Sequence, residues 1–146
     1  MINIPLICAV SAWVVAQLIK TVISVVKLHR FDFVLFWSSG GMPSSHSSTV
    51  TALATSCGIL YGFDSAIFAV ATVLALVVMY DAAGVRRAVG QQARILNKIT
   101  SNLAKKEPVE KSDLRELVGH TPLQVFFGGI LGIVIGILGP YFWGGV

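Results

Sequence analysis

Four long apolar runs dominate this sequence and restrict what it can fold into. They cover residues 4–26, 45–63, 65–80 and 122–143. A helix needs about 20 apolar residues to cross the hydrocarbon core of a bilayer, and each run approaches that length. A spanning segment must also satisfy its own backbone hydrogen bonds, which favours helices. We therefore predict an all-α, polytopic membrane helix bundle of about four transmembrane helices, with residues 1–146 forming a single domain.

The charge content also indicates a membrane protein. Charged residues make up 12% of the 146 residues and hydrophobic residues 55%, whereas soluble domains carry about a quarter charged residues. The net charge of +4 does not indicate a nucleic-acid partner, because the basic residues cluster in one loop instead of among stacking aromatics. Cys8 and Cys57 lie in apolar runs without metal-ligand spacing. We expect buried thiols there, and neither a metal nor a cofactor.

The basic residues are unevenly distributed along the chain. Lys20 lies near the end of the first run, where a long side chain can reach the interface. The other cations lie in the loops after the first and third runs: Lys27, Arg30, Arg86, Arg87, Arg94, Lys98, Lys105, Lys106, Lys111 and Arg115. Four spans place these two loops on one side, which the positive-inside tendency makes cytoplasmic. Both termini are then predicted to lie outside.

Local signals predict how the helices pack. Residues 62–64 allow a tight turn, so the second and third helices should form an antiparallel hairpin. The second helix is the least hydrophobic and should pack among the others. Gly128, Gly132 and Gly136 share one helical face, where missing side chains let another helix approach closely. We expect this face to pack inside the bundle.

Helix boundaries around the third loop can also be predicted. The apolar and basic periodicity of residues 82–103 predicts that the third helix continues as a cytosolic amphipathic extension. Thr121 and Pro122 suit the cap and the first turn of the fourth helix.

The sharpest local signal is SSGGMPSSHSS, residues 38–48. Pro43 suits the first turn of the second helix. A helix N-terminus offers free backbone N–H groups and the positive end of the helix dipole, and Ser44 and Ser45 add hydroxyl donors. His46 can move a proton near neutral pH. The segment predicts a phosphate cradle with a built-in acid. The alternative is a serine-rich capped helix start with an incidental histidine.

Further polar residues should gather on the same membrane face. His120 precedes the fourth helix, and Asp81 ends the third, where Lys20 is its natural partner. Arg86 and Arg87 follow. Guanidinium groups suit bidentate phosphate contacts, although they also bind lipid headgroups. Cations, a nucleophile, an acid and an orienting carboxylate are together the inventory for phosphoryl transfer through histidine.

Three blocks, GGMPSSHSS, YDAAGVRRAVGQQARILN and GHTPLQVFFGG, jointly resemble the divergent, small membrane branch of the type-2 phosphatidic acid phosphatase and vanadium haloperoxidase superfamily. The resemblance covers nearly the whole chain. In that superfamily a Pro-Ser-Gly-His motif supplies an acid histidine. A later Ser-Arg-x5-His-x3-Asp motif supplies the nucleophile and its orienting carboxylate, and an upstream Lys-x6-Arg-Pro motif binds phosphate. The resemblance implies that His46 is the acid and His120 the nucleophile.

The match to these motifs is partial. Ser45 replaces the glycine of the acid motif. Lys20 and Lys27 are the candidates for the upstream lysine, but no Arg-Pro follows either. Arg115 precedes His120 by one residue fewer than the motif requires. Gln124 occupies the position of the aspartate and cannot orient an imidazolium by charge. Asp81 is a candidate replacement for that carboxylate.

Two functions follow from this interpretation. The first is a membrane phosphatase that hydrolyses a lipid phosphate or prenyl diphosphate. Its catalytic residues would be His46, His120 and Asp81, and its substrate-binding residues Lys20, Ser44, Ser45, Arg86 and Arg87. The second is a non-catalytic protein that binds phosphate or anionic lipid headgroups, or acts as a scaffold. In either case we expect an integral protein of a bacterial cell membrane, with its site on the cytoplasmic face and lipids as partners. A homo-oligomer stays open.

The predicted orientation can be tested with C-terminal fusions expressed in bacteria. A green fluorescent protein fusion should stay dark and an alkaline phosphatase fusion should be active, because the C-terminus is predicted to lie outside. Bright fluorescence together with an inactive phosphatase fusion would contradict this orientation and place the polar face outside.

Overall fold

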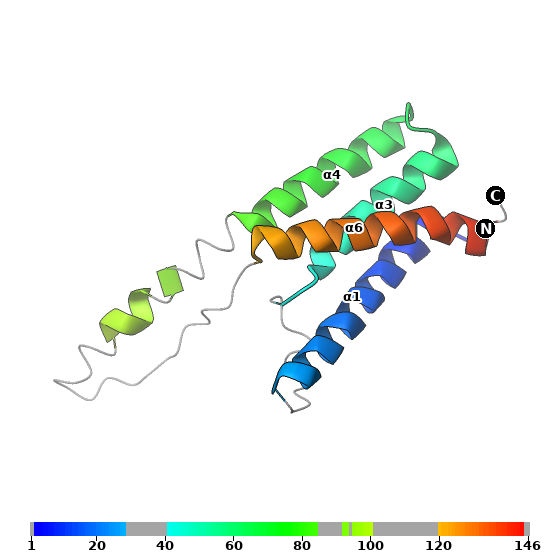
Figure 1. The fold of residues 1–146 in the computed structure, drawn as a ribbon. Helices are drawn as coiled ribbons and strands as arrows, with labels where there is room; N and C mark the ends of the chain where they lie inside the picture. Colours follow the sequence, from blue (N-terminus) through cyan, green and yellow to red (C-terminus); the bar gives the residue numbers. More distant parts are fainter. Residues whose placement is uncertain (1, 29–40, 85–91, 94, 101–119, 145–146) are drawn as a thin grey trace.

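Four long helices form a bundle (Figure 1). The computed structural model describes residues 2–28, 41–84, 92–93, 95–100 and 120–144. Its labelled elements are α1 (Ile4–Leu28), α3 (Ser45–Tyr61), α4 (Ala66–Ala83), α6 (Pro122–Gly139) and a π-helical turn, η1 (Pro140–Gly144). The described residues contain no strand. The prediction of an all-α membrane bundle is confirmed.

Three of these helices are long and apolar enough to cross a membrane. The candidate spans within the described residues are Ile4–Val26, Ala66–Ala83 and Pro122–Trp143. The 17-residue helix α3 is not among them. It packs against α1, α4 and α6, so the bundle shields its Ser and Thr side chains from lipid. The prediction that this helix packs among the others is confirmed.

Side-chain caps set where three of the helices begin. Ser44, Ser65 and Thr121 are the N-caps of α3, α4 and α6, and each side-chain oxygen accepts a hydrogen bond from a backbone N–H of the first turn. The predicted start of the fourth helix at Thr121 and Pro122 is confirmed. The expectation that Pro43 lies in the first turn of α3 was wrong, because Ser44 caps the helix and Pro43 precedes that cap.

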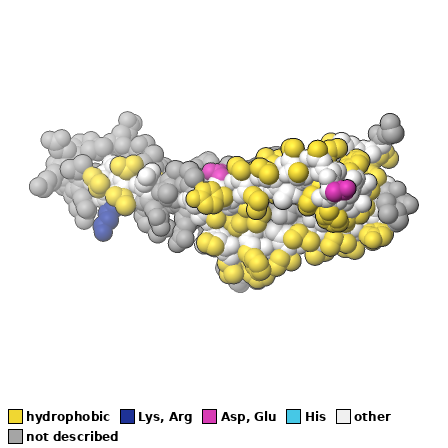
Figure 2. Space-filling model, turned by 90° about the horizontal axis from the view of Figure 1, so that it is seen from above, with side chains coloured by type: hydrophobic (Ala, Val, Ile, Leu, Met, Phe, Trp, Pro, Cys, Tyr) yellow, Lys and Arg dark blue, Asp and Glu magenta, His cyan; other side chains and the backbone are white. Residues whose placement is uncertain are grey.

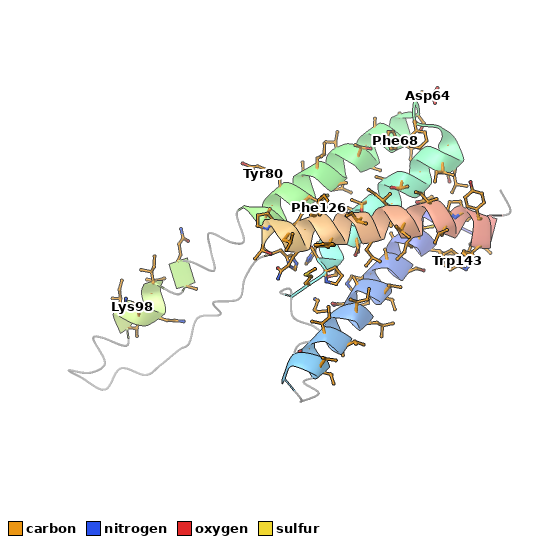
Figure 3. The ribbon with its side chains drawn as sticks, in the orientation of Figure 1. Asp64, Phe68, Tyr80, Lys98, Phe126 and Trp143 are labelled. Atoms are coloured by element: carbon orange, nitrogen blue, oxygen red, sulfur yellow. The ribbon has the colours of Figure 1, made fainter. Side chains whose placement is uncertain are left out.

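A tight turn joins α3 to α4. Gly62 has φ +92°, a conformation that favours glycine, and its N–H donates to the Gly58 carbonyl at 3.0 Å. The rings of Phe63 and Phe68 pack edge to face, with centroids 5.1 Å apart. The predicted antiparallel hairpin is confirmed. Both chain ends lie at one end of the bundle, near the end of α6 where Trp143 lies (Figures 1 and 3).

A glycine face on α6 packs directly against the backbone of α3. A Cβ at Gly128 would collide with Ser44, and one at Gly132 with Ser48 and Thr51. At Gly136 a Cβ would lie 2.8 Å from the Ala52 carbonyl oxygen. The three predicted glycines therefore form an internal seam, hereafter the glycine seam, and not a lipid-facing surface.

The outer surface of the bundle is apolar. Large side chains such as Val70, Leu76 and Phe126 are more than half exposed, and hydrophobic side chains cover most of the bundle face in Figure 2. Lipid is the solvent that accepts such a surface. Of the predicted amphipathic extension, residues 92–93 and 95–100 are helical. Its continuity with α4 rests on residues 85–91, which lie outside the described residues.

The glycine seam predicts a large effect of one substitution. Gly132→Leu should lower the apparent Tm in detergent by several degrees, because overpacking costs about 1–3 kcal/mol or more and the opposing atoms include rigid backbone. Ile133→Leu, on the neighbouring lipid-facing position, is the matched control. Labelling of the buried thiols with a maleimide dye during heating measures both. Equal Tm values for the two variants would show that the seam does not hold the bundle together.

Candidate active site

The N-termini of α3 and α6 meet at one end of the bundle. The Ser44 N–H donates to the Gln124 carbonyl oxygen at 3.0 Å, which joins the two helix starts. The His120 N–H donates to the Ala82 carbonyl oxygen at 3.2 Å, which joins the start of α6 to the end of α4. The first N–H groups of a helix lack intrahelical acceptors, and the dipole places partial positive charge there. Two such ends side by side favour an anion.

His46 and His120 face each other at this junction. Their ring centroids lie 6.1 Å apart, with the ring planes inclined by 60°. His46 is half-buried in the first turn of α3, whereas His120 is only 2% exposed. The structure thus brings together the two histidines that the sequence predicted as acid and nucleophile, although they are far apart along the chain.

Gln124 fixes the orientation of the His120 ring. The Gln124 Oε1 atom accepts a hydrogen bond from the Thr121 N–H at 3.0 Å, which completes a capping box with Thr121. The same oxygen lies 3.3 Å from Nδ1 of His120. Because this oxygen can only accept, the contact favours the neutral tautomer that carries its proton on Nδ1. The lone pair of that tautomer is on Nε2.

Burial favours the neutral form of His120. Removal from solvent lowers the pKa of His120, and the positive charges of His46 and Lys20 lower the pKa further. The hydrogen bond to Gln124 and the Gly41 carbonyl raise the pKa, but they do not offset burial. Nε2 is inaccessible and has no hydrogen-bond partner among the residues the structure describes. A buried ring nitrogen without a hydrogen-bond partner among the described residues thus lies at the junction of two helix N-termini.

Lys20 brings a cation to the same place from α1. Its side chain is only 4% exposed. Gly41 lies against it with φ +99°, and a Cβ at Gly41 would be 3.0 Å from Cγ of Lys20. Glycine at this position therefore allows both the turn and the close approach. The sequence indicates a pliable backbone at Gly40-Gly41, but it does not reveal the contact of Gly41 with Lys20.

The remaining predicted residues have different positions. Ser44 is fully buried, and its oxygen accepts hydrogen bonds from the Ser47 N–H at 3.4 Å and the Ser47 hydroxyl at 3.0 Å. Ser45 is also buried. Substrate binding by these serines stays a prediction.

Asp81 is half-buried. It lies next to Ala82, whose carbonyl oxygen accepts the hydrogen bond from the His120 N–H. Its pairing with Lys20 and its catalytic role stay predictions. Arg86 and Arg87 lie outside the described residues. Within the described ranges, no group of three His, Cys, Asp or Glu residues could hold a metal ion.

These features define a class of protein: a membrane helix bundle with a histidine pair at two joined helix N-termini. The chain belongs to the divergent PAP2 family, whose sequence pattern matches residues 1–135. It is also 41% identical over 154 aligned residues to the uncharacterized membrane protein YuiD of Bacillus subtilis (strain 168), covering 97% of this chain and 96% of that protein. No solved structure matches the chain. The resemblance inferred from the three sequence blocks is confirmed.

The state of His120 can be measured by ¹⁵N NMR of the histidine side chains in detergent. At pH 6.5, where an exposed histidine is about half protonated, His120 should remain neutral because its pKa is lowered, and its proton should be on Nδ1. Gln124→Leu should abolish the preference for Nδ1. A charged His120 at this pH, or a proton on Nε2 in the wild type, would contradict the geometry.

Proposed function

We propose that this protein is a membrane phosphatase that hydrolyses a lipid phosphate or prenyl diphosphate through a phosphohistidine. The pairing of His46 and His120 at the joined N-termini of α3 and α6 carries the proposal. Helix N-termini and a nearby cation stabilise phosphoryl oxygens, and two histidines can divide the roles of nucleophile and acid.

The proposed reaction has two steps. The Nε2 lone pair of His120 attacks phosphorus, and the bond between phosphorus and the lipid oxygen breaks as protonated His46 gives its proton to that oxygen. His46, now neutral, then takes a proton from water. This water attacks the phosphohistidine, the N–P bond breaks, and phosphate leaves with His120 restored. Lys20 and the first N–H groups of α3 and α6 would neutralise the charge on the phosphoryl oxygens in both steps.

Gln124 gives this mechanism a neutral orienting group. The superfamily motif has a carboxylate at that position, which both holds the imidazole and stabilises its positive charge. Gln124 holds the ring through the hydrogen bond to Nδ1 but supplies no charge. We therefore expect a slow enzyme, unless Asp81 supplies the carboxylate from α4.

The charge asymmetry of the loops supports a cytoplasmic site. The starts of α3 and α6 lie toward the end of the bundle opposite the two chain ends (Figure 1). With both termini outside, the substrate would reach the site from the cytoplasmic leaflet.

Binding without catalysis is the second candidate function. The burial of His120 Nε2 favours it, because a phosphoryl group can reach this atom only if the surrounding groups open. In that case the helix N-termini, Lys20 and His46 would hold phosphate or an anionic headgroup at the mouth of the site.

Phosphate release from a panel of lipid phosphates and prenyl diphosphates, measured in nanodiscs, separates these functions. His46→Ala should lower kcat by about 10²–10⁴-fold, the usual contribution of general acid catalysis, with a smaller loss for substrates with good leaving groups. His120→Ala should abolish release. His29→Ala is the matched control, since His29 lies outside the three motif blocks, and should leave activity unchanged.

The covalent step can be trapped directly with labelled substrate and rapid quenching. The label should be acid-labile and base-stable, on the peptide that contains His120. Label on His46 would reverse the two roles. Phosphate release that persists in His120→Ala would rule out the covalent mechanism. If the protein binds these lipids but releases phosphate from none of them, the second function is favoured.

A further inference from the structure

An apolar groove runs between α3 and α4 on the lipid-facing side of the hairpin. It encloses about 380 Å³ and is lined by Leu53 and Cys57 of α3 and by residues such as Ile67, Val70 and Leu74 of α4. The α4 side chains are open to the surroundings, with Val70 71% exposed. Small lining residues leave this space between the two helices: Cys57 on α3, and Ala66 and Ala71 on α4.

The α3 wall of the groove leads to the candidate active site. Leu53 and Cys57 lie seven and eleven residues after His46, so the three residues share one face of the helix. Val50 lies between them on the same face and packs against the core cluster of α3 and α4. With a rise of about 1.5 Å per residue, His46 lies roughly 10 Å from the level of Leu53 along the helix.

The α4 wall leads to the same end of the bundle. Ile67, Val70, Leu74 and Asp81 recur at spacings of three, four and seven residues, which places them on one helical face. Because α4 is antiparallel to α3, Asp81 lies at the end of the groove where His46 lies. His46 and Asp81 therefore lie roughly 10 Å beyond the lining residues, each on the helix face that forms one wall of the groove.

We propose that this groove holds the hydrocarbon tail of the molecule whose phosphate occupies the site. The proposal rests on the proposed function and adds a binding site for the lipid part of the substrate. A tail in the groove would bring its own head group to the level of His46. The occupant is a lipid chain because the groove faces the bilayer and its walls lie on the helix faces that carry His46 and Asp81.

The groove is expected to orient the substrate more than to increase its affinity. Lipid chains are as apolar as the groove walls, so moving a tail from the bilayer into the groove gains little from burial. Fixing the tail along α3 limits where the head group can lie, and such positioning lowers the barrier of the reaction that follows.

Photo-labelling tests this assignment without requiring turnover. The probe is phosphatidic acid with a diazirine midway along one acyl chain, in phosphatidylcholine nanodiscs. The comparison probe is the matched diacylglycerol, which lacks phosphate. Phosphatidic acid should label peptides with residues 53–57 and 67–74 several-fold more than diacylglycerol does.

Two matched variants localise the labelling. Leu74→Trp should fill the groove and lower the labelling several-fold. Leu76→Trp, at an exposed position on another face of α4, should leave it unchanged. Val70→Phe provides a second filling variant if Leu74→Trp fails to fold.

The outcomes separate this proposal from the phosphatase proposal. Phosphate-dependent labelling that Leu74→Trp reduces would support the groove even if no substrate is hydrolysed. Equal labelling by both probes, or labelling unchanged in both filling variants, would overturn the groove even if the enzyme is active.

Discussion

The close backbone contact between α3 and α6 is the interaction on which the rest of the structure depends. Gly128, Gly132 and Gly136 bring α6 against the Ser- and Thr-rich face of α3, at a distance that any side chain would prevent. Apolar burial cannot favour helix association in lipid, because lipid chains are equally apolar. Close packing and polar contacts, such as the hydrogen bond from Thr51 Oγ1 to the Gly129 carbonyl at 3.1 Å, must act instead. The same contact fixes the register that joins the two helix N-termini.

That register determines the chemistry of the site. It places a polar helix start inside an apolar bundle, where α1, α4 and α6 surround α3. His120 is then buried, which lowers its pKa, and it is oriented by Gln124, the residue that also completes the capping box of α6 with Thr121. The Gln124 side chain thus both takes part in capping α6 and favours Nε2 as the basic nitrogen of His120. Capping and ring orientation are therefore coupled in this chain.

Much of this arrangement could be predicted from the sequence, because it follows from local periodicity. The apolar runs, the hairpin and the glycine face depend on spacing alone, and the motif blocks indicated His46 and His120. The role of Gln124 was missed because charge was considered and hydrogen bonding was not. The Oε1 atom of Gln124 contacts both His120 and the Thr121 N–H. This depends on a side-chain conformation that sequence spacing does not reveal. Pro43 was misplaced because Ser44 is the better cap, and the contact of Gly41 with Lys20 depends on tertiary packing.

The central claim is that one anion site is shared by the two helix N-termini and both histidines. A crystal structure grown from a lipid phase and soaked with orthovanadate tests this most directly. We expect vanadium bonded to Nε2 of His120, with His46 within hydrogen-bonding distance of a vanadate oxygen and the first N–H groups of α3 directed at the anion. Vanadate bound elsewhere, or histidine rings too far apart to contact one anion, would contradict it.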